Sequence, residues 1–88
     1  MVRPRRSNPR KASSTPEITR ISKLFADRRV ALRLTQQMLA DLAGVSRSSV
    51  QALEYGTGSI RLASVVEIAD VLGLRLQPMT TADNEGRR

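Results

Sequence analysis

The chain has 88 residues, enough for one small domain, and a formal net charge of +7 from 15 Lys and Arg against 8 Asp and Glu. It contains neither Cys nor His, so we expect no disulfide framework, no metal centre and no histidine general base. No apolar run approaches the roughly 18 residues that span a bilayer, and no signal-peptide pattern opens the chain. We therefore expect a cytoplasmic protein without a cofactor, whose partner is anionic, such as nucleic acid or a membrane surface.

Residues 1–16 form a basic segment that has almost nothing to bury and is predicted to be disordered in isolation. It carries five basic side chains and no acidic one, namely Arg3, Arg5, Arg6, Arg10 and Lys11. The segment could act as an arm that inserts arginines into a minor groove of DNA. The simpler alternative is a solvated tail that attracts phosphates whatever the sequence, because a short Arg- and Pro-rich tail has no demanding geometry.

The first helix is predicted over residues 16–32, with Thr15 as its N-cap and a proline in its first turn. Apolar residues recur at helical spacing and predict its buried face: Ile18, Ile21, Leu24, Phe25 and Leu32. Arg28 and Arg29 are adjacent, so at least one should point partly inward. A buried arginine needs an acidic partner, and Glu54 is the candidate.

Residues 35–56, TQQMLADLAGVSRSSVQALEYG, predict two short helices joined by a tight turn. Thr35 can cap a helix over 36–43, and Ser46 can cap a second helix over 47–55. Gly44 stands where the first helix needs a left-handed residue. This pattern is typical of a helix-turn-helix, whose second helix enters the major groove in DNA-binding versions.

The second of these helices is predicted to bury Val50 and Leu53, and the first to bury Leu39, Leu42 and Ala43. The polar face that remains consists of Arg47, Ser48, Ser49 and Gln51. Arginine can make a bidentate contact with guanine and glutamine with adenine, while serine contacts bases or phosphates. Any helix has a solvated polar face, but this one is short, poor in acids and preceded by the right turn, which favours contact with DNA.

A fourth helix is predicted over residues 62–72 from the apolar positions Leu62, Val65, Val66, Ala69 and Leu72. Beyond it we predict a short strand made of Leu74, Arg75, Leu76, Gln77 and Met79, with Pro78 restricting it to a sheet edge. A lone strand in a helical unit needs a partner from a second copy, so we expect pairing across a two-fold axis. The alternative is an irregular tail that packs Leu74 and Leu76 on the helices. Residues 17–80 are then the DNA-binding and dimerisation domain, and residues 81–88 a disordered tail.

The stretch from about Ile18 to Leu76 resembles the XRE, or Cro and phage-repressor, helix-turn-helix family. The resemblance is carried by Arg29, Leu34-Thr35-Gln36, Leu39-Ala40, Ala43-Gly44-Val45-Ser46, Val50, Leu53-Glu54, Gly56, Ile68-Ala69 and Leu72-Gly73. It implies a mainly α fold, a lambda-repressor-like bundle of four to five helices.

The resemblance also implies roles for single residues. Gln36 would bind a phosphate, Arg47, Ser48 and Gln51 would read bases, and Ser49 would touch backbone or base. Arg29 and Glu54 would form a structural ion pair. Two positions depart from the family pattern: Tyr55 stands where Asn often contacts phosphate, and Arg33 stands where Gly often ends the first helix, so that helix should end without a glycine cap.

Four helices followed by a strand are most similar to HipB-type antitoxins. This resemblance implies a homodimer on a pseudo-palindromic operator in double-stranded DNA, repression of its own operon and binding of a HipA-like kinase toxin. The alternatives are a free-standing XRE-family regulator or a restriction-modification controller and, from another class, a protein-interaction module without DNA binding. An enzyme is not expected, because the acidic residues stand singly on different helices and no glycine-rich phosphate loop is present.

Overall fold

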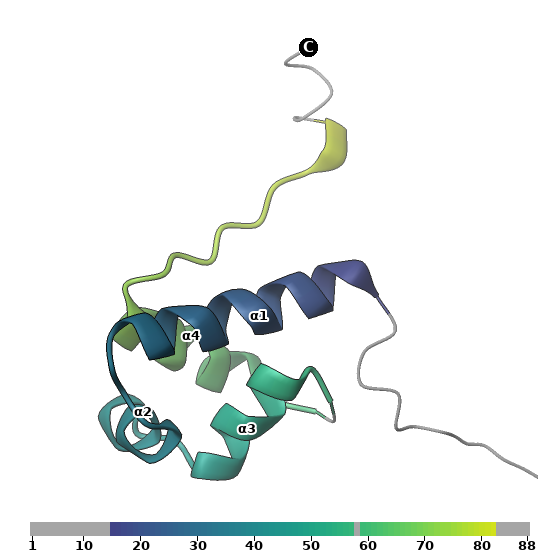
Figure 1. Ribbon diagram of the computed structural model, residues 1–88. Helices are drawn as coiled ribbons and strands as arrows, with labels where there is room; N and C mark the ends of the chain where they lie inside the picture. The colour runs from purple at the N-terminus through teal and green to yellow at the C-terminus, as the bar shows by residue number, and fades with distance from the viewer. Residues whose placement is uncertain (1–14, 58, 83–88) are drawn as a thin grey trace, which may run out of the picture.

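Four α-helices make up the ordered body of the computed structural model, which describes residues 15–57 and 59–82 (Figure 1). They are α1 (Pro16–Ala31), α2 (Gln36–Ala43), α3 (Arg47–Tyr55) and α4 (Leu62–Leu72). In Figure 1, α1 and α4 form the upper layer, and α2 and α3 lie beneath them. The predicted helices are thus confirmed, with α1 ending one residue early. None of the described helices is long and apolar enough to cross a membrane.

Side chains at three helix starts satisfy backbone N–H groups that the helix itself cannot bond. The hydroxyl of Thr15 accepts from Ile18 N–H at 3.2 Å, and that of Thr35 accepts from Met38 N–H at 3.0 Å. Ser46 accepts from Ser49 N–H at 3.1 Å. Local sequence therefore fixes where these three helices begin, whereas Arg61 precedes α4 without a side-chain cap.

Each helix is followed, within two residues, by a residue with a left-handed backbone. Three of these residues are glycines with φ between 71° and 74°, namely Gly44, Gly56 and Gly73. The fourth is Arg33, with φ 62°. Leu34 N–H donates to Arg29 C=O at 3.1 Å and Arg33 N–H donates to Val30 C=O at 2.9 Å, which is a Schellman motif. The helix thus ends without a glycine cap, as expected, and Arg33 adopts the left-handed conformation that glycine would take.

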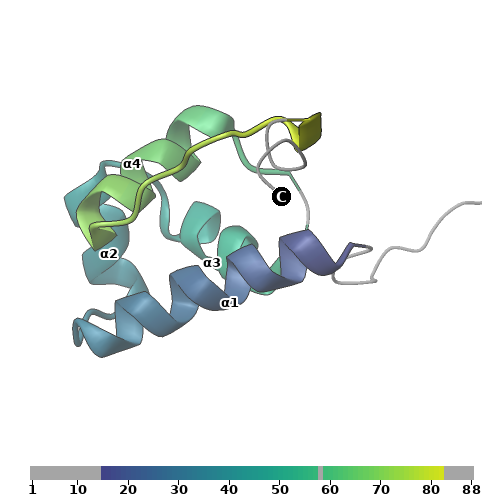
Figure 2. The ribbon, with the colours of Figure 1, turned by 90° about the horizontal axis from the view of Figure 1, so that it is seen from above.

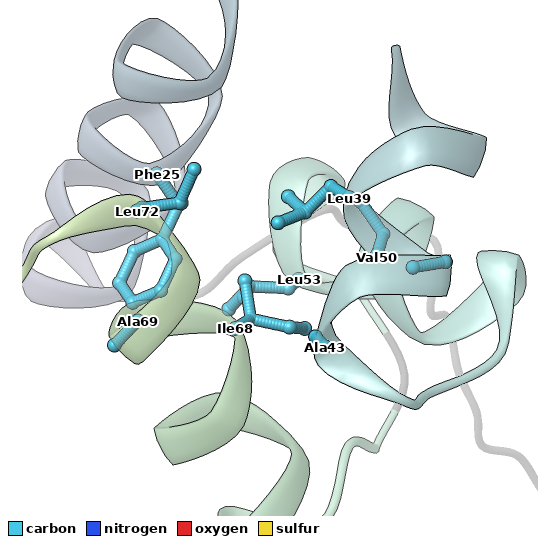
Figure 3. Packing of buried hydrophobic residues seen from close by; sticks show 9 residues of the cluster. Phe25, Leu39, Ala43, Val50, Leu53, Ile68, Ala69 and Leu72 are labelled. Carbon is cyan, nitrogen blue, oxygen red and sulfur yellow. The ribbon is translucent and has the colours of Figure 1, made fainter. Parts of the chain in front are cut away.

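The hydrophobic core contains at least one side chain from each of the four helices. Its fully buried members are Phe25 of α1, Leu39 of α2, Val50 of α3, and Ile68 and Leu72 of α4. Figure 3 shows the Phe25 ring against Leu72 and Ala69. Leu53 and Ile68 lie between that group and the side chains of Leu39, Ala43 and Val50. The residues that follow the Schellman turns, Leu34, Val45 and Leu74, pack against this cluster from its edge. Helix ends and core therefore stabilise one another.

The predicted buried face of α1 was wrong except at Phe25. Ile18 and Ile21 are 44% exposed and Leu24 is 53% exposed. Leu32, just beyond the helix, is 40% exposed, and the buried members of α1 are Phe25 and Ser22. With 16 residues α1 is about 24 Å long, whereas the nine residues of α3 span about 14 Å. The helices beneath are too short to cover all of α1.

Three further apolar residues expected at buried positions are also exposed. Leu42 of α2 is 63% exposed, and α2 buries the small residues Ala40 and Ala43 together with Leu39. On α4, Leu62 is 74% and Val66 is 47% exposed. Helical periodicity marks an apolar stripe, but the number of neighbouring helices decides how much of that stripe is covered.

The predicted C-terminal strand is not present in the described part of the chain. Residues 74–80 are irregular, residues 81 and 82 begin a helical turn, and no strand occurs within residues 15–57 or 59–82. Figure 1 shows this segment leaving the end of α4 and rising above the helical body, and Figure 2 shows it passing along α4, which as a helix offers it no strand to pair with. A strand forms only by exchanging backbone hydrogen bonds with a neighbour. The alternative of a packed tail holds for Leu74 alone, because Leu76 is 40% exposed.

Replacing Arg33 by Gly should stabilise the domain by about 1 kcal/mol. A left-handed backbone costs a residue with a side chain roughly 1–2 kcal/mol, and part of the gain is offset by the greater freedom of glycine in the unfolded chain. Thermal denaturation should show a rise of about 4–8 °C in melting temperature. Arg20→Gly, inside α1 and beyond its first turn, is the control and should lower the melting temperature, because glycine disfavours a helix interior. A lower melting temperature for Arg33→Gly would show that the backbone of Arg33 is not strained.

Candidate nucleic-acid interface

The start of α3 forms the lower edge of the molecule in Figure 1, on the side away from α1. Val50 and Leu53 turn inward and fix the rotation of α3 about its axis. Ala40 and Ala43 of α2 are buried and small, which lets α2 approach α3 closely across the turn at Gly44. The opposite side of α3 therefore faces outward, and Arg47 and Ser48 on it are exposed.

Arg47 is the first residue of α3, and it forms no hydrogen bond or ion pair with any of residues 15–57 or 59–82. Its guanidinium is therefore free to donate to a ligand. Gln51 follows one turn later on the same side of the helix and is half-buried. The two side chains with the best geometry for bidentate base contacts thus stand in one row.

Three serines form a hydroxyl cluster at the N-terminus of α3. The Ser46 hydroxyl lies 3.1 Å from that of Ser48 and 2.9 Å from that of Ser49. These bonds hold the Ser48 and Ser49 hydroxyls beside the free N–H groups of the first helical turn. A helix N-terminus attracts anions, so this cluster suits a phosphate oxygen as well as a base edge.

Arg29 and Glu54 form a buried, bidentate ion pair that ties α1 to α3. Arg29 Nε donates to Glu54 Oε2 at 2.7 Å, and Nη2 donates to Oε1 at 3.0 Å. The side chains are only 16% and 5% exposed. Arg29 Nη1 also donates to Leu34 C=O at 2.8 Å, at the end of α1. The hydrogen bond to Glu54 raises the pKa of Arg29, against the opposing effect of burial.

Gln36 shares the same carboxylate. Its Nε2 donates to Glu54 Oε1 at 3.0 Å, which places the side chain of the first residue of α2 against α3. The amide keeps its carbonyl oxygen and one N–H for other partners. Gln36 is half-buried, and a contact with phosphate would have to use that remaining N–H. The amide is thus held in one orientation before any ligand arrives.

Arg28 has a structural role that sequence reasoning did not assign to it. Its Nε donates to Leu72 C=O at 2.8 Å, at the C-terminus of α4. A cation there bonds an otherwise free carbonyl and lies at the negative end of the helix dipole. Adjacent arginines predicted that at least one points partly inward. Arg29 does, whereas Arg28 is an exposed residue that reaches the end of α4 through its Nε.

The remaining predicted site residues lie apart from this group. Tyr55 is 63% exposed at the end of α3, more than two turns from Arg47. The basic arm residues Arg3, Arg5, Arg6, Arg10 and Lys11 lie outside the described residues. The segment from Leu74 to Met79 leaves the upper layer of the molecule, away from the start of α3 (Figure 1). The structure therefore brings Gln36 to α3 at Glu54, whereas Arg47, Ser48, Ser49 and Gln51 lie in the first half of that helix.

Comparison with known proteins identifies a family and structural likenesses. Residues 24–78, more than half of the chain, match the helix-turn-helix family model. The fold is similar to the crystal structure of the restriction-modification controller protein C.AhdI from Aeromonas hydrophila. The TM-score is 0.62 and the identity 26%, over 69% of this chain and 92% of that one. No curated protein sequence matches the chain at a significant level.

Replacing Glu54 by Gln should lower the free energy of unfolding by about 3–5 kcal/mol, because it leaves the charge of Arg29 buried without a counter-charge. For so small a domain, that is a large part of its stability. Denaturant titration followed by circular dichroism measures the decrease.

The matched control replaces both partners, as Arg29→Met with Glu54→Leu. This double variant should be more stable than Glu54→Gln alone, because no unpaired charge is left. If Glu54→Gln unfolds at the same denaturant concentration as the parent chain, the pair does not stabilise the fold.

Proposed function

Because the chain belongs to the helix-turn-helix family of DNA-binding regulators, which are not enzymes, we propose that it represses transcription by binding a specific operator in double-stranded DNA. The resemblance to the XRE and Cro family is confirmed by this membership, and the all-α, lambda-repressor-like part of the fold prediction by the likeness to C.AhdI. The single observation that carries the proposal is the exposed, acid-free face at the start of α3.

In the proposed complex, the first turns of α3 lie in the major groove. Arg47 donates to guanine O6 and N7, Gln51 reads an adenine edge, and Ser48 contacts a base. Support comes from the free guanidinium of Arg47 and from the common direction of Arg47 and Gln51 on the helix. With no acidic residue between Arg47 and Glu54, this face does not repel DNA.

Backbone contacts then fix the orientation of α3 in the groove. Gln36 donates its remaining N–H to a phosphate at the start of α2, where the helix dipole adds to the attraction. Ser49 contacts backbone or base from the hydroxyl cluster, and the Tyr55 hydroxyl reaches a phosphate at the other end of α3. Glu54 takes no part in this contact, because its charge is neutralised by Arg29 inside the fold.

A second copy of the chain is part of the proposal, since one copy reads only half a site. Two copies of α3 would enter successive major grooves of a pseudo-palindrome, with half-site centres about 34–36 Å apart or at a multiple of that spacing. The segment Leu74–Met79 is the proposed pairing element across the two-fold axis. Beyond Leu74, whose N–H donates to Ala69 C=O, the segment is irregular, and no strand among the described residues pairs with it.

Of the finer assignments, a controller-type regulator is better supported than an antitoxin. C.AhdI is a restriction-modification controller protein, and its fold covers most of the described domain. The HipB-type expectation depended on a C-terminal strand, which the described residues lack. We therefore propose a free-standing or controller-type regulator, with binding of a HipA-like kinase toxin as the second candidate. A kinase gene beside this one would favour the second, and genes for a methyltransferase and a nuclease the first.

Arg47→Ala should weaken binding to the operator by about 1–3 kcal/mol and relax the preference at one base pair. Fluorescence anisotropy on DNA from upstream of the gene, at physiological salt, measures this weakening. Arg20→Ala is the matched control, because it removes the same charge from an exposed position on α1. Equal weakening in both variants would show that only net charge matters. If the parent chain binds no upstream fragment better than random DNA, the repressor proposal falls and a protein-interaction module takes its place.

Replacing the five basic residues of the arm by Gln should weaken binding to all DNA sequences alike. The slope of log K against log salt should become shallower by about 0.9 for each phosphate that the arm no longer neutralises. Titrations at several salt concentrations, on operator and random DNA, measure the change. An unchanged slope would show that the arm does not touch DNA, and weakening confined to the operator would favour specific reading of a minor groove.

A further inference from the structure

A hollow of about 410 Å³ opens between α1, the end of α3 and the loop that leads to α4, and is called the α1–α3 hollow below. In Figure 2, α3 is seen between α1 and α4. The volume is within the range of sites that bind small molecules, roughly 300–1,000 Å³. Most of its lining is apolar and comes from Ile18, Ile21, Ala52, Leu53, Ile60 and Val65.

Ser22 of α1 also lines this hollow, and it is only 6% exposed. Its hydroxyl forms no hydrogen bond with any of residues 15–57 or 59–82. Thr19, three residues earlier on the same helix, differs in this respect, because its hydroxyl donates to Thr15 C=O at 3.3 Å. A buried hydroxyl without a partner is unfavourable. Ser22 therefore offers one hydrogen bond, as donor or acceptor, to a molecule in the hollow.

The lining of the hollow excludes a charged ligand. Among the described residues that line it, none is charged, and the polar side chains besides Ser22 are those of Thr57 and Ser59 in the loop after α3. A charged molecule would lose its hydration here without gaining a counter-charge, which is strongly unfavourable. An apolar molecule with one neutral hydrogen-bonding group suits both the apolar walls and Ser22.

We propose that the α1–α3 hollow binds a small uncharged molecule, with a compact apolar body between the helices and one hydroxyl or carbonyl group bonded to Ser22. Aryl alcohols and phenols are the simplest members of this class. Arg47 and Ser48 lie at the start of α3, whereas the hollow is lined by Gly56 at its end. The site is therefore separate from the residues proposed to face DNA, and it does not depend on the proposed function.

The depth of Ser22 favours a small molecule over a protein surface as the occupant. Ile18 and Ile21 beside it are 44% exposed, whereas Ser22 is 6% exposed. A protein surface laid over the two isoleucines would bury them and leave the hydroxyl unpaired, which remains unfavourable. A molecule that enters the hollow covers the same apolar walls and also bonds the hydroxyl.

Titration of the isotope-labelled full chain with benzyl alcohol, without DNA and followed by NMR, tests the site. We expect saturable shifts of the amide signals of Ser22, Leu53 and Gly56, which line the hollow. Benzoate, which adds a negative charge to a similar ring, is the control and should leave these three signals unmoved at the same concentration. If benzyl alcohol moves none of them, or benzoate binds as tightly, the inference is overturned.

The variant Ser22→Ala tests the hydrogen bond to the ligand. It should weaken the binding of benzyl alcohol about threefold to tenfold and leave the binding of toluene, which has no hydroxyl, unchanged. Ser64→Ala is the matched control and should change neither affinity, because Ser64 is also 6% exposed but lines a different hollow, beside Arg61. Equal binding of benzyl alcohol to Ser22→Ala and to the parent chain overturns the role of Ser22.

Thermal denaturation of the same variant without ligand gives an independent readout. Because the Ser22 hydroxyl has no partner to lose within the described fold, Ser22→Ala should unfold at the same temperature as the parent chain or at a higher one. A lower melting temperature would show that the fold itself already uses this hydroxyl, which overturns the inference.

Filling the hollow from the α3 side distinguishes the proposed site from other occupants. Ala52→Leu places a larger side chain in the hollow and should abolish binding of both benzyl alcohol and toluene, with circular dichroism confirming that the variant is folded. Binding that persists in this variant overturns the inference. If the amide signals of Ser22, Leu53 and Gly56 shift when the free parent chain is diluted, a second copy fills the hollow, which also overturns it.

Discussion

The carboxylate of Glu54 is the point at which three helices of this small domain meet. It stands on α3, accepts two hydrogen bonds from Arg29 of α1 and a third from Gln36 of α2, and is almost completely buried. Taking one ion out of water costs several kcal/mol, and this pair regains that cost only because both oxygens are bonded in good geometry. The same bonds fix the position of α3 relative to α1 and α2, so the orientation of the DNA-facing side chains depends on a charge that faces inward.

The rest of the fold is built around this ion pair from few residues. A chain of this length buries only a modest part of its surface, and its core is a single cluster with one aromatic ring. Arg28 adds a second polar tie, from α1 to the carbonyl end of α4. Apolar surface that a larger domain would cover stays open along α1 and α4, because no fifth helix lies over it within the described residues. The short length of the chain thus explains both the modest core and the exposed apolar surface along α1 and α4.

Local sequence signals predicted most of the secondary structure. They failed where the conformation of a segment depends on other parts of the fold. Thr35, Ser46 and the glycines at 44, 56 and 73 act within one helical turn, so the ends of α2, α3 and α4 could be inferred from the sequence. Arg33 shows the limit of that reasoning, since the turn after α1 imposes a left-handed backbone on a residue that does not prefer it. The strand expected near Leu76 failed for a related reason, because backbone pairing belongs to two segments and the sequence describes only one.

The sequence by itself determined four helices, a helix-turn-helix and the polar row from Arg47 to Gln51, because caps, turns and helical periodicity are local properties of the chain. The Arg29–Glu54 pair came from a family resemblance, and only the tertiary structure gave its geometry and joined Gln36 to it. Tertiary structure alone also decided which apolar residues are buried. Burial depends on how many helices pack over a position, and helix lengths set that number in three dimensions. For this reason Ile18, Ile21 and Leu62 belong to an open surface, although their spacing is that of a core.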